Sequence, residues 1–320
     1  MPVIKSVASG KFILAGEHAV VYGRPAIAVP FHAVEAKATI TPNPRSEPGL
    51  VTIDAPDIQL RTTAAELPDD HPIKLTLTTI IKQLHLQRLP ACTIRITSTI
   101  PIAAGLGSSA ATTIAIIRAV TSFLGHSLPP EIISQMAFEV EKSQHGNPSG
   151  IDNTTISHAQ PIWFIKGQPF EVIPISHPFT FILADTGVQA RTATTVNAVR
   201  EKLEANPTHL EQQLDSIAQL AIEVRSGLEA GNLAICGAAM TANHHILQDL
   251  GVSHPLLDKF VDAALKAGAL GAKLTGGGGG GNMLALVSPE TCEKVDDALR
   301  QAGAVKTYIT HLGPTDAEIS

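Results

Sequence analysis

The hydrophobic positions in the first third of the chain predict several short strands. Segments rich in Val, Ile and Ala are separated by Gly and Pro, and residues 11–15, 25–30 and 34–42 have the composition of strands. Residues 92–98, "CTIRITS", alternate apolar and polar side chains, as a strand with one buried face does. The N-terminal part of the chain is therefore expected to contain a sheet.

Helical periodicity begins in the same region. In residues 71–86 the apolar side chains recur roughly along one face of a helix. Residues 110–125, "AATTIAIIRAVTSFLG", predict an apolar helix that ends at Gly125, and a second helix spans about residues 130–144. A polar turn, "HGNPSGID", follows, and we expect β-like segments from there to about residue 184.

The second half of the chain is mostly helical in pattern. Residues 192–249 predict helices that are interrupted at Pro207 and near Gly231, and another helix is expected over residues 255–267. The last elements are a strand at 282–287, a helix at 289–303 and a strand at 305–312. A chain of 320 residues with this change of pattern indicates two domains, with a boundary near residues 180–190.

Six consecutive glycines, Gly276–Gly281, are either a linker or part of a site. Glycine-rich segments behave as flexible coil, but glycine is also required where backbone must approach a ligand too closely for a Cβ atom. The run lies between a predicted helix and a predicted strand, and only about 40 residues follow it, which is small for an independent domain. A linker is therefore disfavoured.

Composition narrows the class of protein and of partner. Apolar residues make up 44% and charged residues 16%, and the net charge is −6 without a lysine- or arginine-rich run, so a globular protein without a nucleic-acid partner is expected. Cys92, Cys236 and Cys292 are far apart and lack CxxC spacing, which argues against a disulfide framework or a zinc site. No signal peptide and no run of 18 apolar residues is present, so we expect a cytoplasmic protein with no membrane partner.

The segment "PIAAGLGSSAAT", Pro101–Thr112, is a candidate phosphate-binding loop. Its glycines precede a predicted helix, and Ser108 and Ser109 occupy the helix start, where free N–H groups and the helix dipole favour an anion. An ordinary capped helix after a glycine turn explains the same residues equally well. A Walker A loop is excluded because no lysine follows the glycines, and a Rossmann motif because the next element is a second helix rather than a strand.

Two groups of charged residues are candidates for acid–base or metal chemistry. Glu141 flanks the apolar stripe of its predicted helix and, with a serine of the 108–109 helix start, offers the oxygen ligands that Mg²⁺ prefers. Asp152 follows a turn and is either a functional carboxylate or an Asx-type cap. Lys11, Glu17 and His18 lie around a tight "AGEH" turn. They are either charged surface residues without a function or residues that lie over a cleft.

Four segments in this order resemble signatures of the GHMP kinase superfamily, which includes galactokinase and the homoserine, mevalonate and phosphomevalonate kinases. They are "SGKFILAGEHAVVYG", "PIAAGLGSSAAT", "EKSQHGNPSGIDN" and "KLTGGGGGGN". "GEHAVVYG" and "EKSQHGNPSGIDN" are similar to the mevalonate-phosphorylating members in particular. The resemblance runs from about Lys5 to the last strand.

The resemblance implies a two-domain α+β fold with the active site between the domains. Residues 1–185 would form the N-terminal nucleotide-binding α+β domain, and residues 186–320 the C-terminal ferredoxin-like α+β domain. The implied activity is transfer of phosphate from ATP, with Mg²⁺, to the 5-hydroxyl of mevalonate in isoprenoid biosynthesis. Relatives are usually homodimers.

The resemblance also implies a role for individual residues. Asp152 is similar to the family's catalytic aspartate and Lys11 to the lysine beside it, while Ser109 and Glu141 match the Mg²⁺ ligands. The implied substrate-binding residues are Glu17, His18 and Thr192. The residues implied to contact the ATP phosphates are Ala103, Ala104, Gly105, Leu106, Gly107, Ser108 and Ser109, together with Gly277, Gly278 and Gly279 of the glycine run.

The sequence departs from the family pattern at several positions. Ser9 replaces a proline, and the glycine run has Gly277 and then Asn282 where alanine and cysteine are common. Ala190 stands where an arginine is frequent, and Arg191 could substitute from the next position. The rival interpretations are a phosphomevalonate kinase, a mevalonate 3-kinase or a diphosphomevalonate decarboxylase of the same fold, or a ligand sensor without catalysis.

Overall fold

The computed structural model describes residues 3–145, 148–190 and 192–314. The backbone separates into two compact units, each assembled from several stretches of chain. Unit 1 comprises residues 1–10, 34–101 and 107–159, and unit 2 comprises residues 11–33, 102–106 and 160–320. Strands β1 (Ile4–Ala15) and β2 (Ala26–Pro42) contribute residues to both units.

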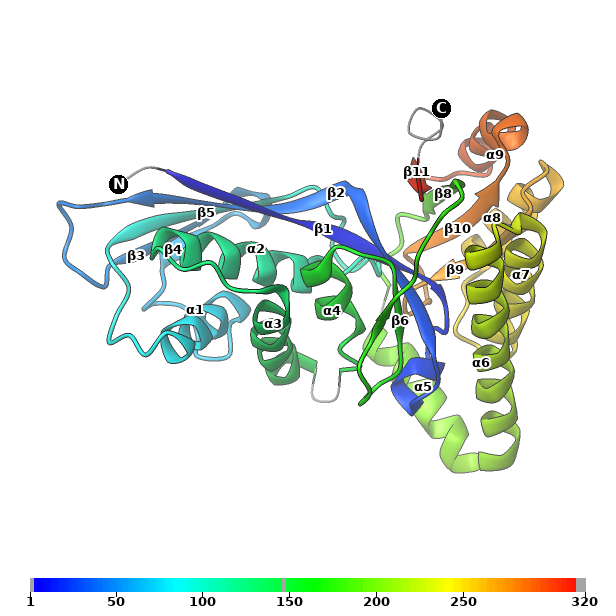
Figure 1. Ribbon diagram of the computed structural model, residues 1–320, viewed down its shortest axis with the longest axis horizontal. Helices are drawn as coiled ribbons and strands as arrows, with labels where there is room; N and C mark the ends of the chain where they lie inside the picture. The colour runs from blue at the N-terminus through cyan, green and yellow to red at the C-terminus, as the bar shows by residue number, and fades with distance from the viewer. Residues whose placement is uncertain (1–2, 146–147, 191, 315–320) are drawn as a thin grey trace. The chain divides into compact units, whose positions relative to one another are not determined.

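Unit 1 consists of a sheet with helices on one side. Its strand order is β4-β3-β5-β2, in which β3 and β5 are parallel and the other pairs are antiparallel. Helices α1, α2 and α3 lie on the same side of this sheet (Figure 1). The further elements of the unit are β3 (Val51–Ala55), η2 (Pro56–Ile58), β4 (Leu60–Thr63), α1 (Pro72–Gln83), β5 (Cys92–Ser98), α2 (Ser108–Phe123), α3 (Pro130–His145) and α4 (Ile151–His158).

Two sequence-based expectations for this part of the chain are wrong. The strands expected at 25–30 and 34–42 are one continuous strand, β2. Residues 153–158, at the start of the stretch expected to be β-like, belong to helix α4 (Ile151–His158). Their Thr and Ile content favours strands, but Ile151 and Ile156 are buried, and α4 packs against α2 and α3, so tertiary packing outweighs local preference.

Arg118 interrupts the apolar pattern of α2 for a structural reason. Its guanidinium donates to the carbonyl oxygen of Ser157 at 2.9 Å and to that of Val7 at 2.9 Å. Ser157 lies in the last turn of α4, whose carbonyl groups have no partners within the helix. Arg118 therefore fastens the end of α4 to α2.

Unit 2 is built on a four-stranded antiparallel sheet with the order β11-β8-β10-β9. Four helices connect β8 to β9, and α9 connects β10 to β11, which is the β-α-β-β-α-β order of a ferredoxin-like fold. The expected C-terminal fold is confirmed. The elements are η1 (Ala19–Tyr22), β6 (Ile162–Phe164), β7 (Glu171–Val172), β8 (Phe179–Asp185), α5 (Thr192–Ala205), α6 (Pro207–Ala230), α7 (Leu233–Asp249), α8 (Pro255–Lys266), β9 (Gly271–Thr275), β10 (Asn282–Val287), α9 (Pro289–Gln301) and β11 (Lys306–Leu312).

The expected helix breaks are also confirmed, whereas the domain limits stay a prediction. Helix α6 begins at Pro207, and Gly231 ends it in a left-handed conformation. The predicted boundary between residues 185 and 186 falls at the end of β8, and β8 itself belongs to the sheet of unit 2.

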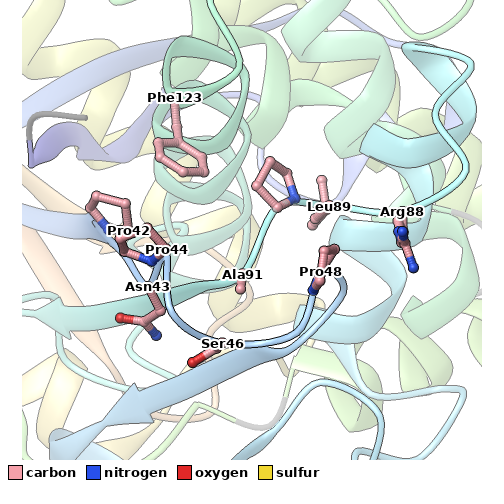
Figure 2. A pocket seen from close by; sticks show the side chains of 10 residues that line it. Pro42, Asn43, Pro44, Ser46, Pro48, Arg88, Leu89, Ala91 and Phe123 are labelled. Carbon is pink, nitrogen blue, oxygen red and sulfur yellow. The ribbon is translucent and has the colours of Figure 1, made fainter.

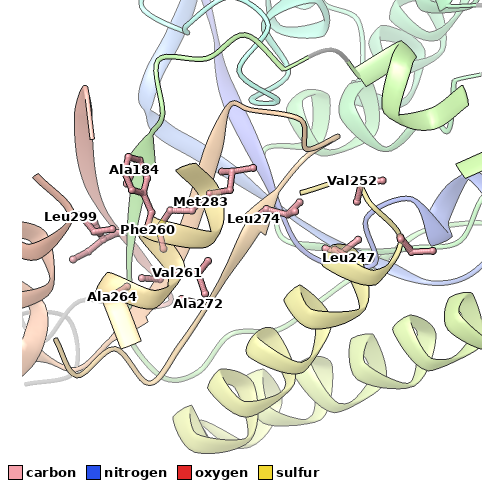
Figure 3. Packing of buried hydrophobic residues seen from close by; sticks show 14 of the residues in the cluster. Ala184, Leu247, Val252, Phe260, Val261, Ala264, Ala272, Leu274, Met283 and Leu299 are labelled. Atoms are coloured by element: carbon pink, nitrogen blue, oxygen red, sulfur yellow. The ribbon is translucent and has the colours of Figure 1, made fainter. Parts of the chain in front are cut away.

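Both faces of the unit 2 sheet are covered by apolar side chains. On one face Ile182, Ala184, Ala272 and Met283 join a buried cluster with the helices (Figure 3). On the other face aromatic rings meet: Phe12 lies 5.8 Å from Phe181 and 6.1 Å from Phe31, between ring centroids. The aromatic contacts bind the end of β1 and the start of β2 to this sheet, which places residues 11–33 in unit 2.

The three cysteines are not joined by disulfide bonds. Cys92, Cys236 and Cys292 all lie in the described ranges and are free thiols, as expected. Burial raises the pKa of Cys92 to about 11 and that of Cys236 to about 12.

Within the described residues no helix has both the length and the apolar character needed to cross a bilayer.

Helix α7 crosses the edge strand β9 at two glycines. A Cβ atom on Gly237 would lie 2.1 Å from the carbonyl oxygen of Leu270, and one on Gly271 would lie 2.1 Å from that of Gly237. No side chain fits between these backbones. The two glycines therefore set the distance between α7 and the sheet.

We expect Gly237→Ala to lower the free energy of unfolding by about 1–3 kcal/mol, because the added methyl group overpacks a backbone contact. In an ordinary helix interior the same change would stabilise the protein by up to about 1 kcal/mol. Urea denaturation distinguishes the two signs. Ala238→Ser, at the next, exposed position, is the control and should change the free energy by less than about 0.5 kcal/mol; a Gly237→Ala protein as stable as the parent would contradict the close crossing.

Candidate active site

The glycine run is the loop of a β-hairpin. It joins β9 to β10, and Thr275 pairs with Asn282 at its base, so the expectation that it lies between a helix and a strand is wrong. The N–H of Gly279 donates to the carbonyl oxygen of Val252 at 2.8 Å, and that of Gly281 to the carbonyl oxygen of Val188 at 2.7 Å. The loop is therefore held by neighbouring segments of unit 2, which a flexible linker would not be.

Glycine is required in this loop by the protein's own backbone. A Cβ atom on Gly278 would lie 2.0 Å from the carbonyl oxygen of Val252, and one on Gly280 would lie 2.7 Å from that of Val188. Gly276, Gly278, Gly279, Gly280 and Gly281 all have positive φ, which strains any other residue. Gly277 is not among the residues with positive φ, so at this position of the run φ does not by itself disfavour alanine.

His18 contacts the glycine run directly. Its Nε2 lies 3.0 Å from the carbonyl oxygen of Gly277, and because a carbonyl only accepts, Nε2 carries the proton and donates. Burial lowers the pKa of His18 to about 4, so the ring is neutral at pH 7. His18 itself has φ of 60°, a conformation rare for residues other than glycine, at the start of η1. A strained residue over a glycine loop is typical of a functional site.

Glu17 forms an ion pair with Lys273 of β9, and both side chains are fully buried. Lys273 also donates to the carbonyl oxygen of Leu274. Burial raises the pKa of the Glu17 carboxyl and lowers the pKa of the Lys273 amine, against the attraction between the two groups. Removing one partner of such a pair leaves a buried charge, at a cost of about 3–5 kcal/mol. The pair ties the turn of the first motif to the strand that enters the glycine run.

Four consecutive carbonyl groups of the candidate phosphate loop accept hydrogen bonds within unit 2. The oxygen of Ala103 accepts from the N–H of Ala190 at 2.7 Å, and that of Ala104 from Asn282 Nδ2 at 2.9 Å. The oxygen of Gly105 accepts from Lys11 Nζ at 3.2 Å, and that of Leu106 from the N–H of Lys11 at 3.0 Å. These bonds fix the path of residues 103–106.

In unit 1 the second half of the same motif starts helix α2. Gly107 occupies the N-cap position with φ of 74°, and no side chain caps the helix. Ser108 and Ser109 form the first turn, where N–H groups lack partners within the helix. Helix α2 therefore has no side-chain cap, and the anion site stays a prediction.

Asp152 and Glu141 lie on neighbouring helices of unit 1. Asp152 is in the first turn of α4, whose N-cap is Gly150, so Asp152 does not have the position of a cap. The amide of Asn153 donates to the backbone oxygen of Ser134 at 3.1 Å and to its hydroxyl at 2.9 Å, which fastens α4 to α3. The half-buried Glu141 is on the same helix α3.

The donor chemistry of unit 1 fits a hard cation. Ser109 and Glu141 supply a hydroxyl and a carboxylate, which are ligands that Mg²⁺ accepts along with phosphate oxygens and water. Among the described residues no group of three or more His, Cys, Asp or Glu side chains is arranged to hold a metal.

Within unit 2 the structure brings together most of the predicted residues. Lys11 contacts Gly105 and Leu106, His18 contacts the glycine run, and Glu17 pairs with Lys273 of the strand before the run. Ser109, Glu141 and Asp152 lie in unit 1. Thr192 begins α5, but its side chain lies outside the described residues, as does Arg191.

Sequence reasoning missed Lys273, Thr275 and Asn282 as supports of this site. The hydroxyl of Thr275 accepts from the N–H of Ile13 at 3.0 Å and donates to its carbonyl oxygen at 2.8 Å. All three flank the glycine run in sequence. Their place beside the run is the one feature of the sequence that could have identified them.

A separate pocket of about 450 Å³ lies elsewhere in unit 1. Figure 2 shows Phe123 beside several prolines there. Phe123 ends α2, whereas Ser108 begins it, and 16 residues of helix span about 24 Å. The pocket is therefore distinct from the predicted phosphate loop. Its lining residues are Pro42, Asn43, Pro44, Ser46, Pro48, Arg88, Leu89, Pro90, Ala91 and Phe123.

Comparison with known families and structures agrees with these motifs. Residues 73–159 match the model of the GHMP kinases N terminal domain, and residues 224–315 match that of the GHMP kinases C terminal region. A Streptococcus pneumoniae phosphomevalonate kinase, solved in complex with phosphomevalonate and AMPPNP, superposes with a TM-score of 0.83 at 17% identity, covering 97% of this chain and all of that one. At that identity the likeness shows the fold alone.

Two further proteins are more similar in sequence. The chain is 34% identical to a mevalonate kinase of Thermococcus sibiricus over 318 residues, which cover 93% of both chains. The L. major mevalonate kinase, solved in complex with R-mevalonate, has a TM-score of 0.81 at 27% identity, covering 97% of this chain and 96% of that one. The chain therefore belongs to the GHMP kinase family, among its mevalonate kinases.

Proposed function

We propose that this protein transfers the γ-phosphoryl group of ATP to the 5-hydroxyl of mevalonate. One observation supports the proposal above all. Within unit 2, Lys11 contacts Gly105 of the candidate phosphate loop, and His18 contacts the glycine run. Both are glycine-rich loops of the kind that binds phosphates. The similarity to mevalonate kinases over nearly the full chain supports the acceptor. A homodimer and a cytoplasmic location remain predictions.

Each proposed residue has a role that follows from its chemistry. Phosphoryl transfer depends mainly on positioning and on stabilising negative charge. Asp152 would accept or orient the proton of the acceptor hydroxyl, and Lys11 would stabilise charge on the transferring group. Backbone N–H groups of residues 103–109 and of Gly277 and Gly278 would hold the phosphates, whereas the N–H of Gly279 donates to the carbonyl oxygen of Val252. Thr192 and His18 would contact the acceptor.

We propose that Ser109 and Glu141 hold Mg²⁺, because their oxygen atoms suit this ion. Bound there, the ion would neutralise the charge of the phosphate groups. Glu17 has a structural contribution in addition to the one implied by the family resemblance. Its buried pair with Lys273 makes it a support for the turn that carries His18, and its contact with substrate stays a prediction.

The charges of unit 2 favour an acceptor without a phosphate group. A phosphorylated acceptor needs additional cations in its pocket. Of the proposed substrate residues with described side chains, His18 is neutral at pH 7 and Glu17 is paired with Lys273. Phosphomevalonate kinase and diphosphomevalonate decarboxylase activities are therefore less well supported. A mevalonate 3-kinase acts on the same unphosphorylated acceptor, so only the position of the phosphate in the product distinguishes it. A sensor without catalysis is disfavoured because Lys11, Asp152 and both proposed Mg²⁺ ligands are present.

A coupled assay of ADP release tests the acceptor. With ATP and Mg²⁺, we expect turnover with mevalonate and background rates with phosphomevalonate, galactose and homoserine, because the chain is similar to mevalonate kinases over nearly its full length. The product should be identified as 5-phosphomevalonate by mass and phosphorus NMR, since the assay alone does not distinguish the 3-hydroxyl. ADP release that does not depend on mevalonate would refute the proposed function.

Asp152→Asn tests the catalytic carboxylate. The change keeps the side-chain shape but removes the basic oxygen, so we expect kcat to fall by roughly 10²–10⁴ with little change in the KM for ATP. Glu139→Gln, which changes an exposed carboxylate of α3, is the matched control and should behave like the parent. Thermal melting establishes that both variants fold; near-normal turnover by Asp152→Asn would show that another group does this work.

A further inference from the structure

Two side chains of helix α7 accept hydrogen bonds from backbone N–H groups of strand β9. Strand β9 is at the edge of its sheet, and N–H groups at an edge need partners if they are buried. The N–H of Ala272 donates to Thr241 Oγ1 at 3.2 Å, and that of Leu274 donates to His244 Nδ1 at 3.2 Å. Leu274 is two residues before the glycine run. His244 therefore acts on the strand that enters the run.

The contact with Leu274 determines the protonation state of His244. Since Nδ1 accepts an N–H, the proton of the neutral ring is on Nε2. Nε2 lies 3.2 Å from Asp258 Oδ1, and the His244 side chain is only 1% exposed. Burial lowers the pKa of His244 to about 4, although Asp258 acts in the opposite direction. The ring is thus neutral at pH 7, as an Nδ1 acceptor must be.

Asp258 extends these contacts to the middle of the glycine run. It lies in the first turn of α8, and its Oδ1 accepts the hydroxyl of Ser253. The residue before Ser253 is Val252, whose carbonyl oxygen accepts the N–H of Gly279. The same oxygen is the atom that a Cβ on Gly278 would strike. The segment that shapes the run is thus anchored by Asp258.

We propose that His244 and Asp258 are positioning residues for the glycine run. Together they link the strand that enters the run to the segment that supports its middle, and they act through backbone without touching a reactant. The inference rests on the proposed function only in taking the run as part of the nucleotide site. The proposal predicts that variants in which the link is broken still fold but bind the nucleotide more weakly.

Asp258→Ala tests the link, because Asp258 is 38% exposed and its loss leaves no fully buried gap. Losing the hydrogen bond from Ser253 and the contact with His244 Nε2 should raise the Kd for MgADP, measured by calorimetry, and the KM for ATP about tenfold, with kcat little changed. Asp258→Asn keeps Oδ1 as an acceptor and should restore both values to within about twofold. Asp262→Ala, at an exposed position on the same helix, is the control and should match the parent.

His244 supplies an independent pair of variants. An asparagine oxygen can replace Nδ1 as the acceptor for Leu274, whereas a glutamine nitrogen can take the place of Nε2 beside Asp258 Oδ1. Each keeps half of the link, so His244→Asn and His244→Gln should each weaken MgADP binding less than His244→Ala. A role confined to folding would lower the active fraction and leave the Kd of the folded protein unchanged.

The outcomes separate this inference from the proposed function. If Asp258→Ala and the His244 variants bind MgADP as the parent does, the positioning role is wrong, whatever the acceptor is. If Asp258→Asn loses as much affinity as Asp258→Ala, the charge rather than the accepted bonds matters, and the account is also overturned. If the parent binds MgADP but does not phosphorylate mevalonate, only the proposed function fails.

Discussion

The approach of backbone to backbone around Gly276–Gly281 is the constraint on which the candidate site depends. The carbonyl oxygens of Val252 and Val188 occupy the space that side chains of the run would need. In return they accept its N–H groups. The run thus has a defined conformation without contributing a single side chain, and its remaining backbone groups can be offered to a ligand.

Buried polar groups carry this order into the neighbouring segments of unit 2. The Glu17–Lys273 pair joins the first motif to β9, and the neutral ring of His18 donates to Gly277. Asn282, at the far end of the hairpin loop, donates to Ala104. Each of these contacts is expensive to break because its partner would remain buried. Such a set of contacts gives the preorganised backbone that phosphoryl transfer requires.

The family motifs allowed much of unit 2 to be predicted from sequence. The two-domain α+β fold, the helix breaks at Pro207 and Gly231, and the ferredoxin-like arrangement are confirmed. Helix α4 was not predicted, because Thr and Ile favour strands locally, and packing against α2 and α3 decides the outcome. Strand β9 and the hairpin were missed because "GAKLT" is too short to show a period.

The supports of the site could not be predicted for a related reason. Lys273 contacts a residue 256 positions away, and Asn282 contacts one 178 positions away. No local pattern reveals such pairs. The motifs indicate which residues meet a ligand, whereas the groups that hold them in place depend on the tertiary fold. The roles of Asp152, Glu141 and Ser109 are predictions that rest on the motifs.

The most direct test compares alanine at two adjacent glycines of the run, with the folded fraction of each variant established by circular dichroism. If the neighbouring backbone requires glycine position by position, Gly277→Ala will keep a KM for ATP and a kcat close to those of the parent. Gly278→Ala, whose Cβ would strike the Val252 carbonyl oxygen, will lose roughly tenfold or more in kcat/KM. Equal activity of the two variants would contradict the account, because a flexible loop tolerates both.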